Sequence, residues 1–276
     1  KNSKITAFGS TMHKDNKPEK DENLLSIVKV KPSVACIFGK TWDLHVKYAL
    51  STTPEKNLDM IFSSVKFLKS NGLEVIYDAE HFFDGYLSNP KYALSTLEAA
   101  VAAGADNITL CDTNGGMLPH QIEKIITEIK INAPLGIHTH NDSGCAVANS
   151  IVAVRSGCVL VQGTLNGWGE RCGNASLSSV IPNLKLKLGI DCIHNEKIKL
   201  LTETSRYLSE VANIIPSDKQ PYTGYSAFAH KGGVHAAAVA KKSSTYEHID
   251  PSVVGNERRV LISELSGSAN IILKSK

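Results

Sequence analysis

Short apolar runs rich in β-branched residues alternate with helical patterns along the first two thirds of the chain. Runs of this kind are typical of strands buried on both faces, and the segments between them repeat apolar residues every three or four positions. Because alternating strands and helices fold into a parallel sheet with helical crossovers, this order predicts an α/β protein. The predicted strands are Ile5–Phe8, Val34–Phe38, Leu73–Tyr77, Asn107–Cys111, Leu135–Thr139 and Val159–Gly163.

The segments between the predicted strands carry ordinary helix signals. One helix should begin with Thr53 as N-cap and Pro54 at its first position, and end at Asn71-Gly72. A second should begin near Pro90 and a third at Pro119. We expect these helices to bury Leu58, Ile61, Phe62, Val65 and Leu68 in the first, Leu94, Leu97 and Val101 in the second, and Ile122, Ile125, Ile126 and Ile129 in the third.

Polar residues stand just after the carboxyl ends of four successive predicted strands. A barrel gathers all of these loops around one mouth, whereas an open doubly wound sheet concentrates its ligand site at one switch point. The pattern therefore favours a (β/α)8 TIM-type barrel, and since the chain opens almost directly on a strand, the first two βα units are expected to be missing. The polar groups concerned are Glu80, Asp112-Thr113, His138 with His140, and Asn166-Gly167.

The alternation of predicted strands and helices stops after about Gly189. We therefore expect a partial (β/α)8 catalytic barrel over residues 1–189 and a small, mainly helical appended subdomain over residues 190–276. A helix from about Asn195 to Val211 should open this subdomain, which would lead into the linker to a missing regulatory domain.

Composition excludes several classes of protein. A chain of 276 residues that is 42% hydrophobic can bury a large core, and its net charge of +3 is spread over interspersed acids and bases, which favours neither nucleic-acid nor membrane binding. The lysine-rich stretch 14–20 also carries acids and should be a solvated loop. No apolar run reaches the roughly 20 residues of a membrane span, and no signal-peptide pattern is present. Six cysteines without a C-x-x-C pair suit reduced thiols in a cytoplasmic protein.

His138 and His140 close one predicted strand, and Asn141-Asp142 follow at once. Since side chains alternate faces along a strand, both imidazoles should point the same way and could hold one divalent ion between them. The alternative is a pair of surface histidines beside a turn.

A glycine-rich loop, residues 163–174, follows the last predicted strand. Its glycine spacing does not match that of a dinucleotide-binding fingerprint. Instead of binding a ligand, the loop could form a tight strand-to-helix turn in which Glu170 and Arg171 make a structural ion pair. Asn174 lies where its carbonyl oxygen could face a metal ion.

Two further groups could carry chemistry. A carboxylate at a barrel mouth, here Glu80, can act as a base, an orienting group or the partner of a cation, although such an acid is often simply exposed. The histidines of the segment 227–235 could be structural, or catalytic if the appended subdomain folds over the mouth.

Taken together, these residues resemble the family of citramalate, 2-isopropylmalate and homocitrate synthases, which are acyl-CoA-condensing, metal-dependent, aldolase-like barrels. The resemblance covers nearly the whole chain. Its most specific segments are HTHNDSGCAVANS (138–150), GTLNGWGERCGNA (163–175) and AFAHKGGVH (227–235), and the segments YDAEHFFDGY (77–86) and TYEHIDPSVVGNERR (245–259) look closest to the citramalate branch.

The resemblance implies a role for each candidate residue. It implies a divalent metal ion (Mn, Zn, Co or Mg) as cofactor, a Thr113 that binds the keto acid, and a Glu80 that acts in catalysis beside it. The other implied residues are the metal ligands His138, His140 and Asn174, and His235 and Tyr246, which would assist proton transfer and thioester hydrolysis.

The reaction implied by the resemblance is the condensation of pyruvate, acetyl-CoA and water to (R)-citramalate and CoA, in the isoleucine branch of branched-chain amino-acid biosynthesis. A cytoplasmic homodimer is expected. The family's Arg-Asp motif would lie on a strand before Lys1, so the chain looks truncated, and we expect weak metal binding and little activity from this piece.

Other functions stay open at this point. Within the same chemistry, the alternatives are a 2-isopropylmalate synthase and, more distantly, a homocitrate synthase. A lyase of the same barrel class is a further alternative. From a different class, the chain could be a non-catalytic synthase fragment that serves only as a partner subunit.

Overall fold

The computed structural model describes residues 3–261, and these form two compact units. The first unit comprises the residues up to 164 together with 168–175, and the second comprises 165–167 and the residues from 176 onward. The second unit thus begins before position 190, where the sequence placed the appended subdomain. The reason is packing: helix α8 (Leu177–Pro182) packs with α10 (Leu201–Val211), and Gln220 Nε2 donates a hydrogen bond to Ser176 Oγ at 3.0 Å.

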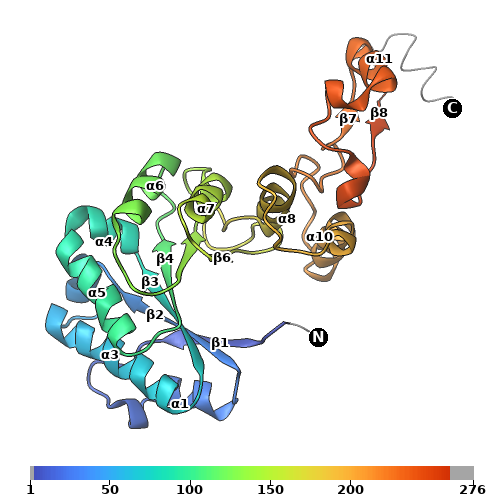
Figure 1. Cartoon of the computed structure of the whole chain (residues 1–276). Helices are drawn as coiled ribbons and strands as arrows, with labels where there is room; N and C mark the ends of the chain where they lie inside the picture. Colours follow the sequence, from blue (N-terminus) through green and yellow to red (C-terminus); the bar gives the residue numbers. More distant parts are fainter. Residues whose placement is uncertain (1–2, 262–276) are drawn as a thin grey trace. The chain divides into compact units, whose positions relative to one another are not determined.

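The first unit is built on one six-stranded parallel sheet whose strands lie side by side in chain order, which confirms the predicted repeat of βα units. Figure 1 shows that the sheet is curved and not flat. The strands are β1 (Thr6–Ser10), β2 (Val34–Lys40), β3 (Glu74–Glu80), β4 (Asn107–Asp112), β5 (Leu135–Thr139) and β6 (Leu160–Gln162).

One contact measures how strongly the sheet curls. Gln162 on β6 donates from Nε2 to Asp78 Oδ1 on β3 at 2.8 Å, although two strands lie between β3 and β6. In a flat sheet strands three places apart would be separated by about 14 Å. The sheet is therefore a half-barrel, as the predicted TIM-type architecture requires.

Helices cover the outer face of the half-barrel (Figure 1). The outer side chains of the strands, among them Ile37, Val75 and Leu110, are fully buried beneath them. The helices are α1 (Glu22–Lys29), α2 (Asp43–Tyr48), α3 (Pro54–Ser70), α4 (Phe82–Ser88), α5 (Pro90–Ala102), α6 (Pro119–Glu128) and α7 (Ala146–Arg155).

Helix α3 has the predicted ends but presents a different face to the core. Thr53 caps it by accepting from Lys56 N, and Asn71 ends it. Phe62, expected to be buried, is 40% exposed, whereas Asn57 is fully buried. The Nδ2 group of Asn57 donates to Lys40 O and to Tyr92 Oη, both at 2.8 Å, whereas its Oδ1 has no hydrogen-bond partner among the described residues. A polar residue with tertiary partners thus sits in the stripe that we expected to be apolar.

The inner face of the half-barrel is the face that carries Cys36, Asp78, Thr109, His138 and Gln162. Residues in register on neighbouring strands point to the same side, and the pairs Lys40–Glu80, Asp78–Thr109 and His138–Gln162 are each in register. The inner face therefore carries polar side chains beside apolar ones such as Phe8 and Phe38, and strand pairing brings its polar side chains together.

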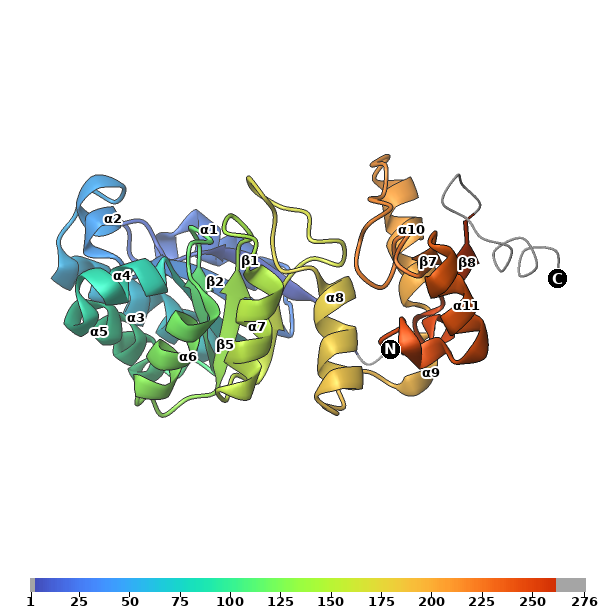
Figure 2. The same ribbon diagram turned by 90° about the horizontal axis from the view of Figure 1, so that it is seen from above.

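The second unit has a smaller core, which includes Leu201, Tyr222, Phe228 and Val254. The predicted helix from about 195 to 211 is interrupted at Lys199–Leu200, so it forms α9 (Asn195–Ile198) and α10. The remaining elements are a π-helical turn (Asn183–Lys187), α11 (Gly233–Lys241), two 3-10 turns (Ser243–Thr245 and Pro251–Val254) and the short parallel strands β7 (Ala229–His230) and β8 (Arg259–Val260). Helix α11 and the two strands can be followed in Figure 2. Within residues 3–261 no helix is both long and apolar enough to cross a membrane.

Candidate active site

The two histidines at the end of β5 lie against each other. His138 is on β5 and His140 is just beyond it, so both side chains leave the strand on its inner side. Their Nε2 atoms are 3.3 Å apart. Burial, followed by the neighbouring His138 and Arg171, lowers the pKa of His140 below its ordinary value. This favours the neutral imidazole, which is the form that binds a metal ion.

Asn174 lies beside His140 because the end of the glycine-rich loop pairs with the end of β5. Asn141 N donates to Gly173 O at 2.9 Å and Ala175 N donates to Thr139 O at 3.0 Å, so His140 and Asn174 form an antiparallel bridge. Asn174 Nδ2 donates to Trp168 O at 3.2 Å. Its Oδ1 is buried and has no hydrogen-bond partner among the described residues.

These three side chains fit a divalent ion. Two nitrogen ligands about 2.0–2.1 Å from one ion lie about 2.8–3.4 Å apart in octahedral or tetrahedral geometry, and the observed Nε2 separation of 3.3 Å falls in that range. The unpartnered Oδ1 of Asn174 is the kind of acceptor that a cation would satisfy. In the described part of the chain, however, no three His, Cys, Asp or Glu side chains converge as a metal site.

Glu80 is the last residue of β3 and not, as predicted, part of the following loop. Its Oε2 lies 2.6 Å from Lys40 Nζ, in an ion pair with side-chain exposures of 22% and 18%. Strands β2 and β3 run longer than expected because these two opposite charges are in register and neutralise each other on the inner face. Glu80 is thus a partly buried, paired carboxylate and not an exposed loop acid.

Thr113 follows β4 and its hydroxyl is held in place. Thr113 Oγ1 accepts from His81 N at 2.9 Å, and its own hydrogen remains for a ligand's acceptor. Arg171 Nη2 donates to Thr113 O at 2.6 Å and binds Asp142 through two hydrogen bonds of 2.7 and 2.9 Å. Arg171 therefore pairs with Asp142, and not with Glu170 as one interpretation of the loop had it.

Asp112, at the end of β4, anchors the loop that carries Thr113. It is fully buried, and its two carboxyl oxygens accept from Gly116 N and Met117 N, each at 3.2 Å. Burial raises the pKa of Asp112 to about 6. Both hydrogen bonds of its carboxyl group are to backbone amides of its own loop, so the Asp112 side chain shapes that loop.

His235 and Tyr246 lie in the second unit, where their rings stack with centroids 4.1 Å apart. Both side chains are exposed. The neighbouring Glu247 is buried and accepts from Arg258 Nε at 2.6 Å, and one of its oxygens lies 3.0 Å from His230 Nε2. This buried cluster anchors the segment on which Tyr246 stands.

The sequence predicted that Asn166 lies at the barrel mouth, whereas the structure assigns it to the second unit. Asn166 belongs to the second unit, where its Nδ2 donates to Ser205 O at 2.9 Å and its Oδ1 accepts from Ser205 Oγ at 2.7 Å. Its amide therefore anchors the loop to α10.

The sequence analysis assigned no role to several polar residues of the site. Lys40, Asp78 and Gln162 all lie on the inner face, and Gln162 Oε1 is 3.0 Å from His138 Nδ1. The available signal was the two-residue spacing of Asp78 and Glu80, which put two carboxylates on one face of a strand. Gln162 carried no comparable signal.

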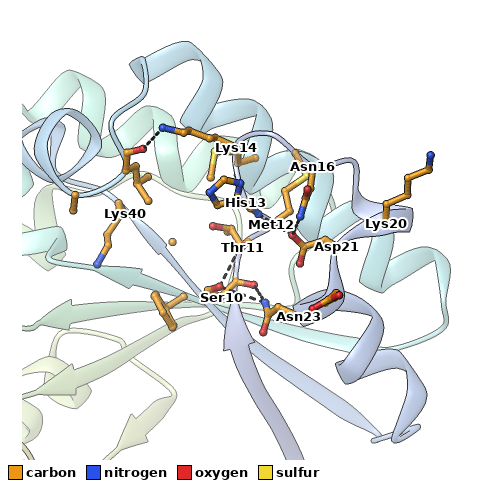
Figure 3. A pocket seen from close by; sticks show the side chains of 16 residues that line it. Ser10, Thr11, Met12, His13, Lys14, Asn16, Lys20, Asp21, Asn23 and Lys40 are labelled. Atoms are coloured by element: carbon orange, nitrogen blue, oxygen red, sulfur yellow. Dashed lines mark hydrogen bonds between the residues drawn. The ribbon is translucent and has the colours of Figure 1, made fainter.

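A cavity of about 520 Å³ opens at the carboxyl ends of β1 and β2 (Figure 3). Lys40 lines one side of it, and the stretch that we read as a solvated loop contributes Lys14, Asn16 and Lys20. Lys14 Nζ donates to Leu50 O at 3.1 Å and to Ser51 O at 2.9 Å, which closes one side of the cavity. The cavity thus adjoins the Lys40–Glu80 ion pair.

Two family profiles match the sequence. One, described as HMGL-like, covers residues 20–208, and the other, described as homocitrate synthase post-HMGL domain-like, covers residues 222–276.

Among curated proteins, the (R)-citramalate synthase of Geobacter sulfurreducens is 56% identical over 99% of this chain and 52% of its own length. The (R)-citramalate synthase of Aquifex aeolicus is 54% identical over 100% of this chain and 53% of its own length. The 2-isopropylmalate synthase of Sulfolobus acidocaldarius is 40% identical over 84% of this chain and 59% of its own length. The chain therefore spans about half the length of the curated citramalate synthases that it matches.

Solved structures share the fold. A Bacillus subtilis HMG-CoA lyase superposes with a TM-score of 0.64 at 18% identity, covering 76% of this chain and 70% of that one. A hydroxymethylglutaryl-CoA lyase from Pseudomonas aeruginosa gives 0.63 at 14% identity, covering 86% and 75%. These likenesses show the barrel-type fold.

Proposed function

The chain belongs to the HMGL-like family, and on that premise we propose that it forms (R)-citramalate from pyruvate, acetyl-CoA and water. The relatives that carry the name (R)-citramalate synthase match it more closely, and over more of its length, than those named 2-isopropylmalate synthase. The observation that carries the proposal is the approach of His138 and His140, with Asn174 bridged to His140, at the same edge of the sheet as Glu80 and Thr113.

The first task of such a site is to hold a 2-oxo acid. A divalent ion bound by His138, His140 and Asn174 would supply Lewis-acid polarisation of the keto carbonyl. The Thr113 hydroxyl has its oxygen engaged by His81 N and would donate its hydrogen to the substrate carboxylate. Arg171 fixes the backbone of Thr113, so the donor keeps one position.

The second task is to move a proton from the acetyl methyl group. We assign Glu80 to this step together with His235 and Tyr246, without dividing the individual transfers among them. The Lys40 ammonium holds the Glu80 carboxylate at the inner edge of β3. The stacked rings of His235 and Tyr246 would assist the hydrolysis of the thioester formed by condensation.

The cavity beside Lys40 supports a thioester as the second substrate. Its volume of about 520 Å³ gives room for an extended acyl carrier arm, and Lys40 belongs both to its wall and to the ion pair with Glu80. A thioester lying in this cavity would bring its acyl group towards the Glu80 carboxylate.

We further propose that the cofactor is a divalent cation, with Mn, Zn, Co or Mg as candidates, since imidazole and amide ligands suit several of these ions. We propose a homodimer in the cytoplasm. The six cysteines are all free thiols in the structure, which fits a reducing compartment.

The test is an assay of the full-length protein with acetyl-CoA and Mn²⁺, in which released CoA thiol is followed and the product is identified by chiral chromatography. We expect (R)-citramalate with pyruvate and at least tenfold slower release with 2-oxoisovalerate. Faster release with 2-oxoisovalerate would assign the chain to isopropylmalate synthesis. The absence of thiol release with either acid, from a folded protein that binds Mn²⁺, would contradict the condensing function.

A further inference from the structure

One amide holds the imidazole of His138 on the side away from His140. His138 Nδ1 lies 3.0 Å from Gln162 Oε1, and the two residues are in register on β5 and β6. An amide oxygen only accepts hydrogen bonds, so Nδ1 must carry the ring hydrogen. The lone pair of neutral His138 is then on Nε2, which faces His140 Nε2 at 3.3 Å.

The orientation of the Gln162 amide is in turn set by Asp78. Gln162 Nε2 donates to Asp78 Oδ1 at 2.8 Å and lies 3.5 Å from Thr109 Oγ1, whose hydroxyl already donates to Asn107 Oδ1. Asp78 Oδ1 is thus the near acceptor of the NH₂ end of the amide, and Thr109 Oγ1 is a distant one. If the amide were turned round, Oε1 would face the carboxyl oxygen of Asp78, a side chain only 5% exposed, and this hydrogen bond would be lost.

We propose that Asp78 and Gln162 are positioning residues, which hold His138 in the tautomer with its hydrogen on Nδ1 and so present Nε2 to a divalent ion. Partners of this kind orient metal-binding histidines and tune their basicity. The metal-binding part of this inference rests on the proposed function, whereas the tautomer of His138 is a property of the protein alone.

His140 lacks such a support. Its Nδ1 is buried and has no hydrogen-bond partner in the described part of the chain. When no ion lies between the rings, the hydrogen in the 3.3 Å contact must belong to His140 Nε2, because His138 Nε2 carries none. His140 therefore changes tautomer when it binds an ion, whereas His138 does not.

The test is nuclear magnetic resonance of the histidine-¹⁵N-labelled, metal-free protein, in which long-range ¹H–¹⁵N correlations report the tautomer of each ring. We expect the hydrogen on Nδ1 in His138 and on Nε2 in His140, and after addition of Zn²⁺ on Nδ1 in both. A His138 with its hydrogen on Nε2 in the metal-free protein would overturn the proposal.

Two substitutions test the relay itself. Gln162→Met removes the acceptor of His138 Nδ1, so we expect a mixture of His138 tautomers and a loss of about 10–100-fold in Mn²⁺ affinity by calorimetry. Asp78→Asn keeps the shape of the side chain but lets the new amide face Gln162 with either end, so a mixture of tautomers is again expected. If Asp78→Asn left His138 wholly in the Nδ1–H form, Asp78 would have no positioning role.

Thr109→Val is the matched control, because it removes another neighbour of Gln162 Nε2 while Asp78 stays in place. It should change neither the tautomer nor the affinity. Thermal unfolding shows whether each variant folds, and Asp78→Asn, being isosteric, decides the question if Gln162→Met does not fold. Because the tautomers are recorded without substrate, a protein that failed to make citramalate could still satisfy this test, and the two failures are distinguishable.

Discussion

Gly169 stands against the amide of Asn174, and the substitution Gly169→Ala tests how the site is assembled. A Cβ at position 169 would overlap Asn174 Nδ2 and lie 3.0 Å from Asn174 Cγ. Carbon atoms in ordinary contact are about 3.5–4.0 Å apart, so the Asn174 side chain would have to leave its place. The backbone of Gly169 also has φ +158, which L side chains rarely adopt.

The loss of stability can be estimated from these two effects. Displacing Asn174 breaks its hydrogen bond to Trp168 O, which is worth about 1 kcal/mol. Placing an L side chain in this backbone conformation costs about 1–3 kcal/mol. We therefore expect Gly169→Ala to lower the free energy of unfolding by about 2–4 kcal/mol, measured by urea denaturation, and to weaken Mn²⁺ binding in calorimetry because Asn174 Oδ1 moves.

Gly116→Ala is the control for this change. Nothing lies within 4 Å of a Cβ built at Gly116, and its φ is not in the left-handed region. The same substitution should therefore be neutral there or stabilise by up to about 1 kcal/mol.

A double-mutant cycle separates the overlap from the backbone strain. In an Asn174→Ala background the side chain that Gly169 accommodates is gone, so the destabilisation by Gly169→Ala should shrink by about 1 kcal/mol. Strictly additive effects of the two substitutions, or a Gly169→Ala variant as stable as the parent, would refute the view that Gly169 is small in order to admit Asn174.

Three further predictions concern other parts of the molecule. In the full-length protein, Glu80→Gln should reduce the turnover of acetyl-CoA by about 10²–10⁴-fold with little change in Mn²⁺ affinity, as measured by thiol release and calorimetry; turnover near that of the parent would exclude Glu80 from proton transfer. Because burial raises the pKa of Asp112 to about 6 from an unfolded value of 3.8, its contribution to stability is fully present below pH 3.8 and is lost as the pH rises through 6. Urea denaturation across this range should show a loss of about 3 kcal/mol that Asp112→Asn abolishes, and an unchanged slope in that variant would contradict this. Arg258→Met leaves the buried Glu247 carboxylate without its bidentate partner and should destabilise the second unit by roughly 3 kcal/mol in thermal or urea unfolding, whereas an unaffected midpoint would show that His230 suffices.

The order of elements could be read from the sequence because it is local information. Thr53 and Pro54 define the start of α3 through bonds within one turn of helix, and each buried strand is a short apolar run. The burial of Phe62 was predicted wrongly because the choice between Phe62 and Asn57 depends on partners from β2 and α5, which periodicity alone does not reveal.

The candidate site divides in the same way. That His138 and His140 point to one side of β5 follows from the alternation of side chains along a strand, so the pair could be found without a structure. The role of Gln162 could not be found in this way, because its contacts with Asp78 and Cys36 cross the half-barrel from β6 to β3 and β2. Likewise Asn166 and Asn174 lie eight residues apart in the same loop, and only the fold assigns them to different units.

The linear pattern by itself determined the βα repeat, the polar ends of the strands and the paired imidazoles, since each depends on neighbours a few residues apart. Only the tertiary structure decided which polar side chains contact one another. It pairs Lys40 with Glu80, binds Arg171 to Asp142, and sets the Gln162 amide against His138. Those contacts join residues 24 to 40 positions apart. Strand register brings Lys40 to Glu80 and Gln162 to His138, whereas the bond from Asn141 N to Gly173 O joins the two loops that carry Asp142 and Arg171.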